Sequence, residues 1–176
     1  DTRTLTVACV GDSRVVLCQD GMATELSCDH RLTNAEELSR VATAGGVIAK
    51  LRINGVLAVS RSFGDVAHKG PHPQRVLIAT PDVQTLEMTA FKSSFLLMAT
   101  DGIWDVMHSQ YAVNFVLTTL ETHAANVKQA ADQLAKEAIR LGSVDNVSVV
   151  IVLFNVEVEG PAAGESPPPD GDWQPR

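Results

Sequence analysis

The sequence has 176 residues, of which 45% are hydrophobic and 20% charged, and its formal net charge is −7. This composition is typical of a globular protein that can bury a sizeable core, and the acidic balance argues against nucleic acid as the main partner. No stretch reaches the ~20 consecutive apolar residues that a membrane-spanning helix needs, so we predict no membrane partner.

The chain opens with a strand pattern. Leu5 to Val10 and Val15 to Cys18 are apolar stretches separated by the turn sequence Gly-Asp-Ser, and we predict a hairpin with Asp12 at its tip. Because no leader or capping sequence comes before the first strand, we predict that the chain begins inside a sheet and is a fragment of a longer domain.

The middle of the chain mixes helical and extended patterns. Thr33 and Glu36 have the spacing of a capping box, which predicts a helix through Val41 that stops at Gly45. Residues 46–53 should form a short strand or loop, and residues 68–75 a surface loop. Further strands are predicted at Leu77–Thr80, Val83–Glu87, Ser94–Thr100 and Val147–Phe154.

Two helices are predicted before the last strand. Ser109 can cap one that reaches about Glu121, and the other runs from about Ala125 to Leu141, with Gly142 as its stop. Clustered strands with two long helices inserted before the final strand predict an α+β layered sandwich rather than a doubly wound parallel sheet.

The end of the sequence differs from the rest. Residues 160–176 hold five of the eight prolines, so they cannot sustain a helix or a sheet ladder. We therefore predict a folded domain over residues 1–159 and a disordered tail after it.

The three cysteines are an odd number without CxxC spacing, which predicts reduced thiols rather than disulfides or a zinc site. Together with the absence of a signal peptide, this predicts a cytoplasmic or nuclear location. A truncated start would have removed any address signal, so this expectation depends on what precedes Asp1.

Four aspartates stand at the ends of predicted strands. Asp12 lies on a turn, Asp101 follows a buried strand, Asp145 precedes one, and Asp105 follows Asp101 by one helical turn. If neighbouring strands run antiparallel, these carboxylates converge on one rim of a sheet. No Lys or Arg is interleaved with Asp101 or Asp105, so a hard cation such as Mg²⁺ or Mn²⁺ is the natural way to relieve their repulsion.

Each aspartate also has an ordinary structural explanation. Asp12 and Asp145 fit turn and loop chemistry, and Asp105 fits a solvated position near a helix start. Spacing alone leaves the structural role and the metal site both open. A calcium-binding domain is disfavoured, because no Asp-x-Asp-x-Asp-Gly loop is present.

Five motifs occur in a fixed order along the chain. They are GDSR (Gly11–Arg14), AGG (Ala44–Gly46), NGVLAVSRSFGD (Asn54–Asp65), ATDGIWDVM (Ala99–Met107) and GSVDNVSVVIV (Gly142–Val152). This set, which spans nearly all of residues 1–159, resembles the metal-dependent protein phosphatase family of the 2C type, whose members act on phosphoserine and phosphothreonine.

The resemblance implies a four-layer α/β/β/α sandwich, in which two antiparallel sheets are flanked by helices and carry a binuclear Mg²⁺ or Mn²⁺ centre at one end. It implies a phosphoprotein substrate, hydrolysed when a metal-bridging water attacks phosphorus. Asp101 and Asp145 would act in catalysis by holding the second metal. Asp12, Asp101 and Asp105 resemble the ligands of a weaker third metal.

The resemblance also assigns a flap to residues 30–60. It makes Ser60, Arg61, Gly64 and Asp65 structural residues that fix the return of the flap to the sheet. We expect a monomer.

The sequence also departs from the family. It lacks the arginine that binds phosphate and the Asp-Gly-His-Gly segment that supplies a bridging aspartate, so the phosphate-binding residues are unknown. None of the five histidines (His30, His68, His72, His108 and His123) matches a catalytic one. We therefore predict that the 176-residue chain alone is inactive.

The alternative is a phosphatase-fold binding module that has lost catalysis, a pseudophosphatase. Retention of the four aspartates favours the enzyme, since a scaffold has little reason to cluster carboxylates.

Overall fold

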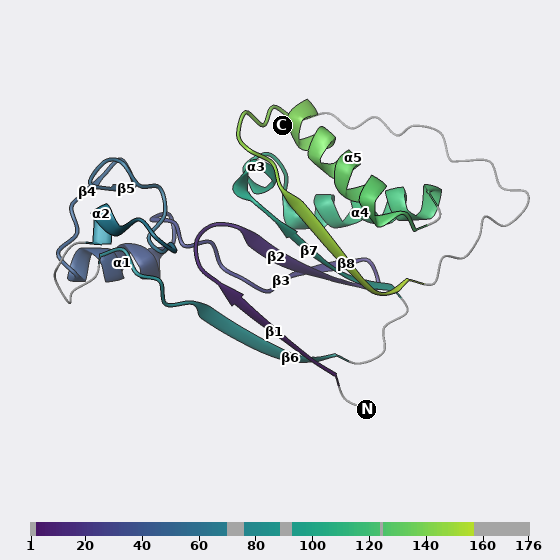
Figure 1. Ribbon diagram of the computed structural model, residues 1–176, viewed down its shortest axis with the longest axis horizontal. Helices are drawn as coiled ribbons and strands as arrows, with labels where there is room; N and C mark the ends of the chain where they lie inside the picture. The colour runs from purple at the N-terminus through teal and green to yellow at the C-terminus, as the bar shows by residue number, and fades with distance from the viewer. Residues whose placement is uncertain (1–2, 70–75, 89–92, 124, 157–176) are drawn as a thin grey trace, which may run out of the picture.

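The computed structural model describes residues 3–69, 76–88, 93–123 and 125–156, and they form two antiparallel sheets and a helical layer (Figure 1). One sheet pairs β1 (Arg3–Cys9) with β6 (Asp82–Met88). The other has the order β3-β2-β7-β8. Its strands are β2 (Arg14–Gln19), β3 (Met22–Glu25), β7 (Ser93–Ala99) and β8 (Val149–Val156).

Alternation along the central strands builds a core on each face of the four-stranded sheet. In β2, Val16 and Cys18 face the helices, whereas Leu17 between them packs with Val7 of β1 and Leu96 of β7. Successive side chains of a strand point to opposite faces, so one strand serves both cores. The smaller core joins the two sheets.

The helical layer covers the outer face of the four-stranded sheet (Figure 1). It consists of α4 (Ser109–Thr122) and α5 (Val127–Arg140). Val113 and Val116 of α4 and Leu134 of α5 are fully buried against strand residues such as Phe95. Burial of side chains of this size contributes about 1.5–3 kcal/mol each. No helix in the described ranges is long and apolar enough to cross a membrane.

The predicted flap forms a separate lobe at one end of the sheets (Figure 1). Within residues 30–60 it contains α1 (Ala35–Thr43) and the two-residue strands β4 (Ile48–Ala49) and β5 (Arg52–Ile53). The lobe also includes the short helix α2 (Val66–Lys69), which follows the predicted flap. Its small core is formed by Leu32, Val41, Ile53 and Leu77.

The α+β class with antiparallel sheets is confirmed, but the predicted hairpin is wrong. β1 pairs with β6 and β2 with β3 and β7, so the turn at Asp12 carries the chain from one sheet to the other. The physical reason is burial of apolar side chains: Val7 of β1 and Leu17 of β2 pack together in the core between the two sheets.

Two helix starts also differ from the prediction. Asn34, not Thr33, caps α1, and its side chain accepts from the Glu36 N–H. His108, not Ser109, caps α4, because its Nδ1 accepts from the Tyr111 N–H at 3.2 Å. At each helix start, two adjacent residues have side chains that could accept a hydrogen bond from a free backbone amide. The local sequence therefore does not decide which of the two is the cap.

The remaining boundaries need smaller corrections. Residues 77–80 form only an isolated bridge, between Ile78 and Arg61, and no strand. The loop predicted at residues 68–75 begins inside α2, which ends at Lys69, and residues 70–75 lie outside the described residues. The predicted tail also lies outside the described residues, so the domain boundary at residue 159 stays a prediction. Helices cover one face of the sandwich within the described ranges, where the four-layer expectation had two.

Candidate metal centre

Asp101 and Asp105 lie on one short helix at the end of β7. This helix, α3 (Asp101–Trp104), begins after Thr100, and the Asp105 N–H donates to the Asp101 carbonyl at 2.8 Å. The segment therefore makes the helical turn that the i, i+4 spacing predicted. Trp104 anchors it, because its indole is buried and donates to the Ala99 carbonyl at 2.8 Å.

The loop that carries Asp145 is clamped against the start of α3. The Thr100 hydroxyl donates to the Asn146 carbonyl at 3.1 Å and accepts from the Ser148 N–H at 3.0 Å. Gly102 permits this approach, since a Cβ there would lie 2.4 Å from the Asn146 carbonyl oxygen. The Asp145 carboxylate accepts from the N–H of Asn146 at 2.6 Å.

We expect Gly102→Ala to destabilise the protein by about 1–3 kcal/mol, because the added methyl group forces the Asp145 loop away from α3. Chemical denaturation would measure the loss. Val144→Ala is the matched control, since Val144 lies in the same loop and is fully exposed. If Gly102→Ala is as stable as wild type, the Asp145 loop can move away from α3 without loss of free energy of unfolding, and the prediction is wrong.

Asp12 is placed by its neighbours in the turn between the sheets. The Gly11 N–H donates to Nδ1 of His30 at 3.0 Å, and the His30 N–H donates to the Gly11 carbonyl at 2.9 Å. Because Nδ1 accepts, the ring proton lies on Nε2 and is donated to Asp82 at 3.0 Å. His30 is therefore a buried structural residue, and it ties the turn to the first residues of the flap.

Arg31, the next residue, brings three of the four aspartates together. Its Nε donates to Asp12 Oδ2, its Nη2 to Asp101 Oδ2, and its Nη1 to Asp105 Oδ1, each at 2.7 Å. We call these four residues the Arg31 cluster. The Arg31 side chain is 24% exposed, compared with 19% for Asp12. Asp105 is more exposed, at 55%, so the hydrogen bonds to Asp12 and Asp101 are the better shielded ones. Charge-assisted hydrogen bonds of this length are among the stronger ones in proteins.

The sequence argument missed Arg31. It noted correctly that no basic residue is interleaved with Asp101 or Asp105, and inferred that a hard divalent cation is the natural way to relieve their repulsion. The structure supplies a guanidinium from 70 residues away along the chain. No local pattern signals this, because a lone arginine in a flap segment looks like any solvated one.

The cluster remains strongly acidic despite Arg31. Burial and the neighbouring Asp12 charge raise the pKa of Asp101 above its ordinary value, Arg31 opposes this rise, and Asp145 and Asp105 add to it. The hydrogen bond from Thr100 to the Asn146 carbonyl places the Asp145 loop beside the start of α3, and no hydrogen bond joins Asp145 to Arg31 among the described residues. Burial would lower the pKa of Arg31, but hydrogen bonds with Asp105 and Asp12 raise it overall.

The donor chemistry of the Arg31 cluster fits Mg²⁺ or Mn²⁺, since both prefer carboxylate oxygens. The geometry is adapted to the guanidinium instead. Within the part of the chain that the structure describes, no three His, Cys, Asp or Glu side chains are arranged to hold a metal ion as they stand. A cation among Asp12, Asp101 and Asp105 would therefore need Arg31 to move aside.

A second polar network fixes the return of the flap. Glu37 is 3% exposed and receives hydrogen bonds from Arg40, Arg61 and the Ser60 hydroxyl. Arg61 also donates to Asp82 at 2.7 Å, the same carboxylate that His30 contacts. Arg61 thus ties Glu37 of the flap to the start of β6, whereas the Ser60 hydroxyl bonds within the flap, to Glu37.

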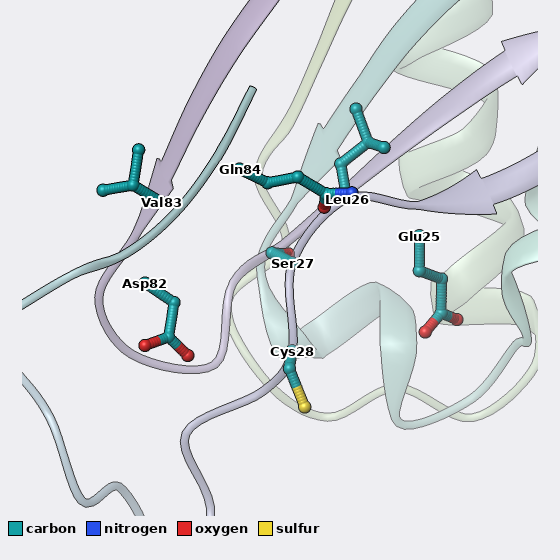
Figure 2. A pocket seen from close by; sticks show the side chains of 7 residues that line it. All are labelled: Glu25, Leu26, Ser27, Cys28, Asp82, Val83 and Gln84. Atoms are coloured by element: carbon teal, nitrogen blue, oxygen red, sulfur yellow. The ribbon is translucent and has the colours of Figure 1, made fainter. Parts of the chain in front are cut away.

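A cavity of about 350 Å³ lies beside this network, between the segment after β3 and the start of β6 (Figure 2). Its lining is Glu25, Leu26, Ser27, Cys28, Asp82, Val83 and Gln84. None of the four predicted metal ligands is among these residues. The cavity and the Arg31 cluster are therefore different sites, with Asp82 serving the flap network as well as the cavity wall.

The chain was compared with known protein families and structures. A family model described as "Protein phosphatase 2C" matches residues 1–147, a span that includes all four aspartates. The chain belongs to the protein phosphatase 2C family. "Probable protein phosphatase 2C 47" of Oryza sativa subsp. japonica is 44% identical over 90% of this chain and 41% of its own length. "Protein phosphatase 2C homolog 1" of Saccharomyces cerevisiae is 37% identical over 86% and 50%.

Solved structures of the family give the same result. A crystal structure of a phosphatase from Toxoplasma gondii matches with a TM-score of 0.79 and 33% identity, and covers 88% of this chain and 49% of that one. The chain thus spans about half the length, or less, of these protein phosphatase 2C relatives. The antiparallel α+β fold and the family predicted from the motifs are both confirmed.

Proposed function

We propose that this chain forms the part of a protein serine/threonine phosphatase that carries the second metal and the weaker third one. The complete protein would hydrolyse phosphoserine and phosphothreonine in phosphoproteins with two Mg²⁺ or Mn²⁺ ions, or three when the weaker site is filled. The observation that carries this proposal is the convergence of Asp12, Asp101 and Asp105 on one point of positive charge, with Asp145 clamped beside them.

The residues of this chain would act mainly through position. Asp101 and Asp145 would hold the second metal, and Asp12, Asp101 and Asp105 the third. When bound, such ions supply Lewis acidity and lower the pKa of a coordinated water. The hydrogen bonds of Thr100 and the close approach at Gly102 hold the Asp145 loop against the start of α3, where Asp101 lies. The comparisons give no support to the pseudophosphatase alternative.

The test is turnover of a phosphoserine peptide by the complete protein in which this chain occurs. We expect phosphate release with millimolar Mn²⁺ that exceeds a metal-only blank and stops on chelation. Turnover that persists after chelation would contradict the metal-dependent reaction. No turnover with any of several phosphopeptides would contradict the enzyme.

The 176-residue chain assayed alone should be inactive toward the same peptide and toward a small aryl phosphate. It lacks the motif that in the family supplies the bridging aspartate and the arginine that binds phosphate. Circular dichroism would establish that the assayed chain is folded. Metal-dependent turnover by the chain alone would show that other residues replace the missing ones.

A further inference from the structure

Arg31 has an unusual set of partners for a partly buried arginine. All of its side-chain hydrogen bonds in the described part of the chain go to the carboxylates of Asp12, Asp101 and Asp105. These carboxylates come from two places, the turn between the sheets and the short helix after β7. Arg31 therefore holds together two segments that would otherwise repel each other.

We propose that Arg31 is a built-in counter-ion that competes with divalent cations for this cluster. It holds the three carboxylates together when no cation is present, and it must leave when a cation binds among them. This inference rests on the proposed function for the identity of the ion, Mg²⁺ or Mn²⁺. It goes beyond that function by assigning to a flap residue the control of cation affinity.

The backbone of Arg31 is fixed while its side chain is free to leave. The residue forms a bridge with Val59, its carbonyl accepts from the Asn34 N–H at 3.0 Å, and its neighbour His30 is locked to Gly11. The guanidinium has no other hydrogen-bond partner among the described residues, and part of it reaches solvent. Departure of the guanidinium therefore breaks only its contacts with the three carboxylates, and the backbone contacts of Arg31 can stay in place.

Occupancy by the guanidinium and by a cation should exclude each other. The oxygens Asp12 Oδ2, Asp101 Oδ2 and Asp105 Oδ1 all face one positive group at 2.7 Å. A cation that took the same oxygens would lie next to the guanidinium and be repelled by it. The measured cation affinity is then the intrinsic affinity reduced by the fraction of molecules in which Arg31 has moved away.

The test is Mn²⁺ binding to the metal-stripped complete protein, measured by calorimetry and by paramagnetic resonance of the free ion. The variants are Arg31→Gln, Arg31→Lys and, as a charge-matched control, Arg52→Gln. Arg52 is exposed, and its side chain donates to the Val56 carbonyl within the flap lobe. Thermal melts with and without Mn²⁺ provide the second readout.

We expect Arg31→Gln to bind Mn²⁺ on the order of tenfold to a hundredfold more tightly. The reason is that a cation no longer has to break the hydrogen bonds of the guanidinium, and the loss of one hydrogen bond to a charged group is enough for a tenfold change in affinity. Its metal-free form should melt at a lower temperature than wild type, and Mn²⁺ should raise that temperature by more. Arg52→Gln should match wild type. Arg31→Lys should bind more tightly than wild type, because a single ammonium nitrogen cannot replace the three separate guanidinium nitrogens that each contact one carboxylate.

The outcomes separate the inference from the function on which it rests. If wild type binds Mn²⁺ and Arg31→Gln binds it equally or more weakly, the counter-ion role is overturned and the proposed function stands. If Arg31→Lys binds Mn²⁺ with wild-type affinity, the proposal that the cation displaces the guanidinium from the carboxylates is overturned. The positive charge at position 31 would then act on the cation only at long range. If neither wild type nor any Arg31 variant binds Mn²⁺, the proposed metal-dependent function is contradicted. The proposed competition between Arg31 and the cation is then contradicted as well.

Discussion

Asp101→Asn is expected to reduce phosphatase turnover of the complete protein by at least about a hundredfold, since even residues that only orient metal ligands contribute about 10–100-fold. Asp101 is the one aspartate assigned to both the second and the third metal. The substitution removes its charge but keeps an oxygen of the same reach. Steady-state hydrolysis of a phosphoserine peptide over a range of Mn²⁺ concentrations measures the effect.

The fold should survive this change. The Asp101 side chain is 29% exposed, and its Arg31 contact can be kept by the amide oxygen. Asp145→Asn should be as damaging to turnover. Asp105→Asn should cost only about tenfold, because we assign Asp105 to the third site alone. Asp132→Asn on the exposed face of α5 is the control. Near wild-type turnover of Asp101→Asn at saturating Mn²⁺ would refute the assignment.

Glu37→Gln should lower the free energy of unfolding by about 3 kcal/mol, as expected when one partner of a buried ion pair is removed. Arg61, only 12% exposed, would lose its buried counter-charge, and Arg40 would lose a 2.8 Å contact. Chemical denaturation measures the change. Glu36→Gln is the matched control, one residue earlier in α1 and exposed. Equal stabilities of the two variants would show that the flap network is dispensable.

The same network should make stability sensitive to acid. Burial alone would raise the pKa of Glu37, but hydrogen bonds from Arg40, Arg61 and Ser60 outweigh it and lower the pKa well below its ordinary value of 4.5. A carboxyl with a lowered folded-state pKa stabilises the fold above its unfolded pKa and loses that contribution as pH falls. Wild type should therefore lose stability steadily below about pH 4.5. The Glu37→Gln protein should lose less over the same range.

The sequence by itself determined the family, the fold class and most secondary structure. Short apolar runs bounded by turn residues placed β2, β7 and β8 to within about two residues, because strands that pack against a core carry such runs, and β6 was placed to within one. The glycines that end α1 and α5 were also predicted, since Gly45 and Gly142 adopt positive φ angles that other residues avoid. The sequence also predicted that the four aspartates lie at the ends of strands and helices, because each one is next to a predicted strand or turn.

What surrounds those aspartates was decided only by the tertiary structure. The sequence pattern predicted that β1, the strand before Asp12, forms a hairpin with β2. In the structure β1 pairs with β6 instead, and its apolar side chains pack against the four-stranded sheet. Arg31 lies 70 residues from Asp101 in sequence, and Glu37 lies 24 from Arg61, so no local period links them. Electrostatic partners depend on distance in space, whereas sequence patterns report only neighbours along one element. The charge that balances the carboxylates was therefore set by how the flap packs against the sheets.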